Sequence, residues 1–299
     1  MRRKVIQIAD STQLVSLPRK WAVAHDIKKG DELEVLADGD TLTITTDKGT
    51  RIEKAKLHFD DASKFLRRNI DVIYRYGFDE VEVTFNDPSI IDLVQDCLDE
   101  LIGFEIIHQG PNSCTIRDVA SGREVEFDSI LRRLFFMITD MAKNSYGAIK
   151  DGAVERLGKL EHFDTLTNKI TNLCERLLNK NGYKGQKKKT LIYYMVCQLE
   201  QVADEFRELC VYVKENKSYR ISKEALSILN AAGELIDHFS KIFYEFNIEG
   251  LYQLKQRNVR IANDIRKRLE SKAGSTDTFV LYHLNSINSQ IQHMSTRIL

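Results

Sequence analysis

The chain of 299 residues lacks the short motifs that usually mark catalytic and cofactor sites. It contains no G-x-x-x-x-G-K-[ST] phosphate loop, no G-x-S-x-G nucleophile turn and no H-E-x-x-H metal motif. No pattern of catalytic residues is therefore visible. We expect a protein without enzymatic activity.

Cysteine is scarce, and its spacing excludes the common cysteine frameworks. There are five cysteines, an odd number, and no C-x-x-C occurs. This pattern is typical of free thiols in reducing surroundings, and the apolar positions of most of them predict core packing. The five are Cys97, Cys114, Cys174, Cys197 and Cys210.

Long apolar runs are also missing. No run approaches the roughly 18 apolar residues that a membrane-spanning helix needs. The apolar stretch after Arg2, Arg3 and Lys4 is too short for a signal peptide. We therefore expect a cytoplasmic protein without membrane insertion.

The chain has no net charge, with 44 Lys and Arg against 44 Asp and Glu, but the charge is unevenly spread. Residues 1–30 hold seven basic residues against two acidic ones. Contacts to phosphate supply most of the non-specific affinity for nucleic acid, so this local excess favours a polyanionic partner.

Residues 2–46 consist of short β-branched runs separated by turn residues. Pro18 predicts the start of a small helix over 19–26, and Asp38-Gly39-Asp40 predicts a hairpin connection. A unit this short buries too little apolar surface to fold alone, so we expect it to dimerise. The four predicted strands lie at 5–8, 14–17, 33–36 and 42–45.

The letters L-V-S-L-P-R-K-W and D-I-K-K-G-D-E-L-E-V in this stretch resemble the AbrB/SpoVT/MazE family of swapped-hairpin DNA-binding domains. The resemblance implies a homodimer in which two copies of residues 1–47 interlace into one small β-barrel. It also implies a basic face that binds double-stranded DNA. The alternative is that these cations are only solvated. We assign DNA binding to Arg2, Arg3, Lys4, Arg19 and Lys20.

Residues 48–60 are charged and poorly periodic, which predicts a link. Residues 60–120 then predict a small α/β module. Its predicted helices cover 62–76 and 88–101, and its three predicted strands, which form one sheet, cover 81–85, 104–108 and 114–119.

Residues 127–299 predict a helical bundle with short connections. Apolar residues recur at helical spacing, as at Met195, Leu199, Val202 and Phe206. The predicted fold class is therefore multidomain α+β: a swapped-hairpin barrel, an α/β connecting module and a six-helix bundle. The six predicted helices cover 127–150, 154–180, 187–217, 221–247, 248–272 and 276–299.

A repeat of three helices relates the two halves of this region. Aligning Leu199 with Leu284 matches the apolar Val202 with Ile287. Here the chain resembles the PhoU family of tandem three-helix repeats. Its domain order resembles archaeal phosphate-uptake regulators that place an AbrB-type domain before a PhoU-like bundle. The stretches R-R-N-I-D-V-I-Y-R-Y-G-F-D-E-V-E-V and I-L-R-R-L-F-F-M-I-T-D-M carry this second resemblance.

The PhoU resemblance implies a cluster of divalent or ferric metal ions on the bundle surface, held by E(D)xxxD motifs. Glu200 and Asp204 fit this motif, and their spacing of four places both carboxylates on one helix face, which we expect to be exposed. Asp164 and Glu161 of the preceding helix would complete the site. The alternative is a solvated acidic surface. The motif does not recur in the second repeat, where an amide and a hydroxyl residue stand instead.

Residues 179–189 form a basic stretch that leads into a helix N-terminus. Lysines there oppose the helix dipole, which favours an anionic partner: nucleic acid, an acidic protein surface or phosphate. Solvation alone is the simpler alternative.

Two functions stay open. The first is a DNA-binding transcriptional regulator of phosphate uptake, whose helical bundle senses a ligand or metal or binds a partner. The second is an adaptor that does not bind DNA and negatively regulates a phosphate ABC transporter through its ATPase subunit. An antitoxin would explain the N-terminal domain alone and would leave the bundle without a role.

Overall fold

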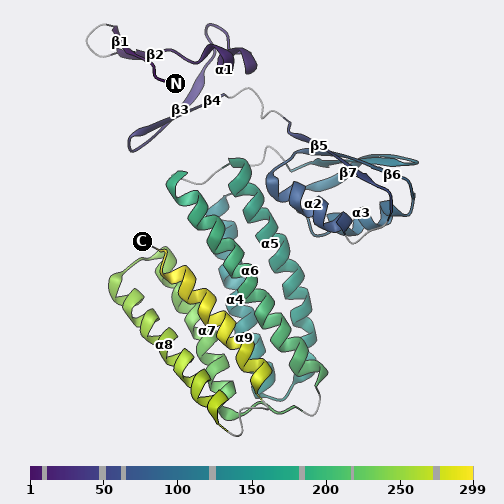
Figure 1. Cartoon of the computed structure of the whole chain (residues 1–299), viewed down its shortest axis with the longest axis vertical. Helices are drawn as coiled ribbons and strands as arrows, with labels where there is room; N and C mark the ends of the chain where they lie inside the picture. The colour runs from purple at the N-terminus through teal and green to yellow at the C-terminus, as the bar shows by residue number, and fades with distance from the viewer. Residues whose placement is uncertain are drawn as a thin grey trace. The chain divides into compact units, whose positions relative to one another are not determined.

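A computed structural model describes residues 1–8, 12–46, 52–61, 65–120, 126–181, 186–216, 219–271 and 277–298 (Figure 1). The chain divides into two compact units, Met1–Ile52 and Glu53–Leu299. The first boundary thus lies close to the predicted link, while the finer division at 60–120 and 127–299 stays a prediction. Among the described helices, none combines the length and apolar character that a membrane span requires.

The first unit contains the four strands and the short helix that the sequence predicts. The strands form two separate antiparallel hairpins, β1–β2 and β3–β4. Gly39, at φ +59°, supplies the left-handed backbone of the tight turn between β3 and β4. The barrel itself stays a prediction, because it needs strands from a second copy. The elements are β1 (Val5–Ile8), β2 (Thr12–Val15), α1 (Arg19–Ala24), β3 (Leu33–Asp38) and β4 (Thr41–Thr46).

The second unit begins with a four-stranded sheet in the order β5-β6-β8-β7. β5 runs parallel to β6, whereas β8 is antiparallel to both β6 and β7. Helices α2 and α3 lie against one face of this sheet (Figure 1). The bounds are β5 (Lys54–Phe59), α2 (Phe65–Tyr76), β6 (Glu80–Phe85), α3 (Ile90–Leu98), β7 (Phe104–Gly110) and β8 (Ser113–Asp118).

The predicted link at 48–60 is wrong over its second half, because β5 occupies Lys54–Phe59 and brings the sheet to four strands. Alternate residues of β5 point to opposite faces of the sheet. Lys56 forms an ion pair with Glu82 of β6 on the exposed face, at 2.6 Å. Such charged residues interrupt the short apolar alternation and conceal the strand in the sequence.

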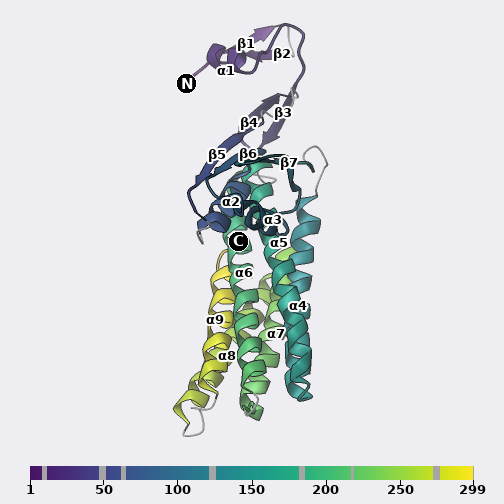
Figure 2. The ribbon, with the colours of Figure 1, turned by 90° about the vertical axis from the view of Figure 1, so that its right-hand side faces the viewer.

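Within the described residues, six long helices follow, and they run alongside one another (Figure 2). The prediction for 154–180 needs correction. A 3-10 turn, η1 (Val154–Lys159), which contains the poor helix former Gly158, precedes α5. The helices are α4 (Phe127–Lys150), α5 (Leu160–Asn181), α6 (Gln186–Glu215), α7 (Lys223–Tyr244), α8 (Ile248–Glu270) and α9 (Thr278–Ser295).

The helix contacts repeat between the first three helices and the last three. Helices α4, α5 and α6 contact one another, and so do α7, α8 and α9. The two sets meet through two pairs of equivalent helices, α4 with α7 and α6 with α9. One continuous apolar core runs through both sets, with Leu199, Phe206 and Leu284 fully buried.

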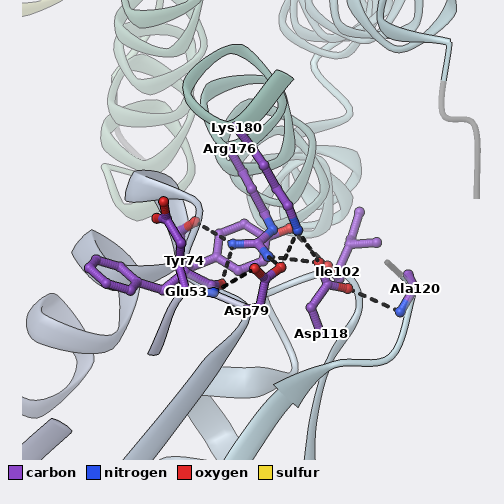
Figure 3. A network of polar contacts seen from close by, with 9 residues as sticks. Glu53, Tyr74, Asp79, Ile102, Asp118, Ala120, Arg176 and Lys180 are labelled. Carbon is purple, nitrogen blue, oxygen red and sulfur yellow. Dashed lines mark hydrogen bonds and ion pairs between the residues drawn. The ribbon is translucent and has the colours of Figure 1, made fainter. Parts of the chain in front are cut away.

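A buried ionic network links α5 to the sheet module, which consists of the four-stranded sheet with α2 and α3 (Figure 3). The guanidinium of Arg176 donates to Asp118 at 2.7 Å and to the backbone oxygens of Tyr74 and Phe78 at 2.9 and 2.8 Å. Lys180, one turn further along α5, forms an ion pair with Asp79. Arg176 is only 3% exposed. These contacts account for the single compact unit that the module and the helices form.

Candidate nucleic-acid interface

The first unit shows no buried core among the residues whose burial is described. On β3–β4 the register places Leu33, Val35, Ala37, Leu42 and Ile44 on one face, with polar side chains such as Glu34 and Thr45 on the other. Val35 is 56% and Leu42 67% exposed.

The first hairpin also carries an apolar face. Ile6, Ile8 and Leu14 lie together on one side of β1–β2 and are 45–56% exposed. Fully burying one such side chain contributes about 1.5–3 kcal/mol. Two hairpins with uncovered apolar faces therefore need a partner surface to make a stable domain.

The five predicted DNA-binding residues lie in the two chain segments that flank the first hairpin. Val5, where β1 begins, pairs with Val15, where β2 ends. The chain before β1, with Arg2, Arg3 and Lys4, and the chain after β2, which leads into α1, therefore depart from the same end of the hairpin. Arg19 and Lys20 stand in the first turn of α1. The register thus places the two segments that carry these basic groups at the same end of the hairpin, although the groups are 15 residues or more apart in sequence.

All five of these cations are exposed to solvent. Within the described part of the chain, none of them forms an ion pair. By contrast, Lys28 of the same unit pairs with Asp26 at 3.1 Å. Unpaired exposed cations at one end of a hairpin are suited to contact the phosphates of a duplex.

The predicted metal residues lie elsewhere, between α5 and α6. Glu200 and Asp204 are half-buried, as is Asp164 of α5, so the predicted exposed face is wrong. The reason is that α6 packs against α5 as well as against α4 and α9. The face opposite the buried stripe of α6 lies near Glu175 and Asp164 of α5, which is why a projection of one helix gave these carboxylates as exposed.

One of these carboxylates has a cationic partner. Asp164 is paired with Arg207, whose Nε lies 3.2 Å from Oδ1. Within the described residues, no group of three or more His, Cys, Asp or Glu side chains is arranged to hold a metal ion. The side chain of Glu161 lies outside the described residues. The four-residue metal site therefore stays a prediction.

Glu175 is a buried carboxylate in this region that no sequence pattern indicated. It is 2% exposed and accepts hydrogen bonds from the Tyr193 hydroxyl at 3.0 Å and the Cys197 thiol at 3.3 Å. The Arg75 guanidinium of α2 lies 3.7 Å away. Burial, with the neighbouring charges of Glu175 and Asp204, raises the pKa of Glu200 to about 7.

We expect Glu200→Gln to stabilise the protein much more at pH 8 than at pH 5. The pKa of Glu200 is higher in the folded chain than the ordinary value of 4.5, so the folded state holds the extra proton. Stability therefore falls as pH rises from about 4.5 to 7 and stays low above that range. Since Glu200 is partly exposed, we expect a gain of about 2 kcal/mol at pH 8.

Urea unfolding at the two pH values measures this difference. Glu105→Gln, a change at an exposed carboxylate of β7, is the matched control and should have no effect at either pH. Equal effects of Glu200→Gln at pH 5 and pH 8 would contradict a raised pKa at this position.

The five cysteines are free, as the sequence predicts, and four of them are buried. Burial raises the pKa of Cys174 to about 12 and that of Cys210 to about 11, so both thiols stay protonated at neutral pH. They fill the core and are poor nucleophiles.

Comparison with protein families relates the first unit to a known family. Residues 6–52 match the family described as antidote-toxin recognition MazE, bacterial antitoxin. No curated protein and no solved structure matches the chain. The matched residues end where the first compact unit ends, at Ile52. The N-terminal part of the chain is therefore similar to the MazE family, which supports the AbrB/MazE-type resemblance, while the PhoU-like part stays a prediction.

Proposed function

We propose that this protein is a DNA-binding transcriptional regulator. Its first unit dimerises by covering the apolar faces of β1–β2 and β3–β4 with those of a second copy. The observation that carries the proposal is the combination, in one small unit, of uncovered apolar faces with unpaired cations at one hairpin end. The match of residues 6–52 to the MazE family supports both dimerisation and DNA binding, since domains of this type typically do both.

Dimerisation would place two copies of the basic group on one molecule. Ten cations, five from each chain, would then be available to the two strands of a duplex. Contacts with phosphate position a protein on DNA and make its affinity strongly dependent on salt. No catalytic step is part of this proposal.

The helical region would serve as the sensing or partner-binding part. The same pattern of helix contacts occurs in α4–α6 and in α7–α9, which supports a pair of three-helix repeats of the PhoU kind. The role in phosphate homeostasis rests on the sequence resemblance. This role predicts that transcription of the target genes responds to external phosphate. An effector would act by binding unequally to two arrangements of the dimer, which changes how the basic groups are presented.

An antitoxin is a second candidate, because the description of the matching family names that activity. It would use the first unit and would assign no role to Glu53–Leu299, which holds most of the chain.

Fluorescence anisotropy with a mixed-sequence duplex at several salt concentrations tests the proposal. We expect binding at low salt with a steep salt dependence. Absence of binding at low salt would refute the regulator and favour the adaptor.

A further inference from the structure

A cavity of about 430 Å³ lies where α2 meets the end of α5 and the start of α6. Pockets for small organic ligands measure about 300–1,000 Å³, and this cavity falls within that range. It is much larger than a bare oxyanion requires. The cavity is lined by Val72, Arg75 and Tyr76 of α2, Asn179 of α5, and Lys189, Thr190 and Tyr193 of α6.

The charged groups of the described lining are all cationic. Lys189 is half-buried and forms no ion pair with any described residue. The Arg75 guanidinium has only long contacts, at 3.7 Å to Glu175 and 3.4 Å to the backbone oxygen of Asp71, whereas the Arg176 guanidinium is 2.7 Å from Asp118. Lys189 and Thr190 belong to the start of α6, where the helix dipole adds positive potential. The cavity therefore favours a ligand with an anionic group.

The rest of the lining suits a planar apolar group. Tyr76 is 66% exposed, so most of its side chain is open to solvent or to a ligand. Val72 lies one helical turn before it, and the half-buried Tyr193 lies across on α6. Aromatic side chains in such settings stack against rings, and they do so with every nucleobase because each has a π-face.

We propose that this cavity binds a phosphomonoester that carries a planar ring, such as a mononucleotide. The phosphate would bind Arg75 and Lys189, and the ring would pack against Tyr76. A phosphate at Arg75 would compete with Glu175 for the guanidinium. Arg75 also accepts a hydrogen bond at its backbone oxygen from Asn179, at 2.8 Å. Binding would thus act on the contact between the sheet module and α5. The binding itself is independent of DNA, while a regulatory role for it rests on the proposed function.

Isothermal titration calorimetry of the full chain with AMP, GMP, CMP and UMP, without DNA, tests the proposal. We expect saturable binding of at least one nucleotide. Its nucleoside and inorganic phosphate should each bind at least about tenfold more weakly, because each supplies only half of the contacts. Failure of all four nucleotides to bind would overturn the proposal. Equally tight binding of the nucleoside or of inorganic phosphate would do the same.

Two variants locate the site. Lys189→Gln should weaken nucleotide binding roughly tenfold without changing the melting temperature, since this side chain has no described ionic partner. Tyr76→Ala should weaken nucleotide binding but leave the weak binding of phosphate unchanged. Lys143→Gln, at an exposed cation of α4 outside the cavity, is the matched control. Unchanged nucleotide affinity in Lys189→Gln would refute the assignment. If the wild type does not bind DNA, the nucleotide-binding result still stands, and only the proposed function is refuted.

Discussion

Replacing Arg19 and Lys20 by alanine is expected to reduce the salt dependence of DNA binding by nearly half. Each phosphate contact contributes about 0.9 to the slope of log K against log salt, so ten cations per dimer predict a slope of about −9. The double variant removes four cations from the dimer, two from each chain, and leaves about −5. Affinity should fall correspondingly at every salt concentration below the physiological value.

Arg133→Ala with Lys143→Ala is the matched control for this prediction. Both residues are exposed on α4 and form no ion pair within the described residues, so this variant removes the same charge from the second unit. Its slope should equal that of the wild type. If Arg19→Ala with Lys20→Ala keeps the wild-type slope, the basic group at the end of β1–β2 does not contact DNA.

Arg176→Ala is expected to destabilise the second unit by about 3–5 kcal/mol, because it removes one partner from a buried ionic network. The buried carboxylate of Asp118 would lose its closest cation, at 2.7 Å. The backbone oxygens of Tyr74 and Phe78 would lose a donor. The rings of Tyr74 and Phe104, each with its centroid 4.9 Å from the guanidinium carbon, would lose a packing surface. Urea denaturation followed by circular dichroism measures the change.

Arg133→Ala serves again as the control and should change stability by less than about 0.5 kcal/mol, as surface substitutions usually do. Adding Asp118→Asn to Arg176→Ala should recover part of the loss, because the buried carboxylate that lost the guanidinium is then replaced by a neutral amide. A loss below 1 kcal/mol in Arg176→Ala would show that the network contributes little to holding the sheet module on α5.

The sequence predicted most elements because their signals are local. Helix α4 has the predicted bounds, and the hairpin at Asp38-Gly39-Asp40 follows from turn chemistry. Strand β5 was missed because alternating lysines on its exposed face weaken the apolar signal.

The buried polar contacts could not be predicted from the sequence, because they join residues that are far apart along the chain. Arg176 meets Asp118 across 58 residues, and no local spacing signals such a pair. Glu200 was placed on the correct face of α6, but its surroundings depend on which helices pack there. Helical periodicity orients a side chain relative to its own helix. It does not identify the neighbour that covers that side chain.

We propose that the apolar hairpin faces of the first unit are covered by a second copy. Sedimentation equilibrium of the wild type and of a Val35→Asp, Leu42→Asp variant tests it most directly. Both residues are more than half exposed in a single chain, so the variant should not disturb an isolated unit. We predict twice the mass of one chain for the wild type and the mass of one chain for the variant. A monomeric wild type, or a variant that dimerises as tightly as the wild type, would contradict the account.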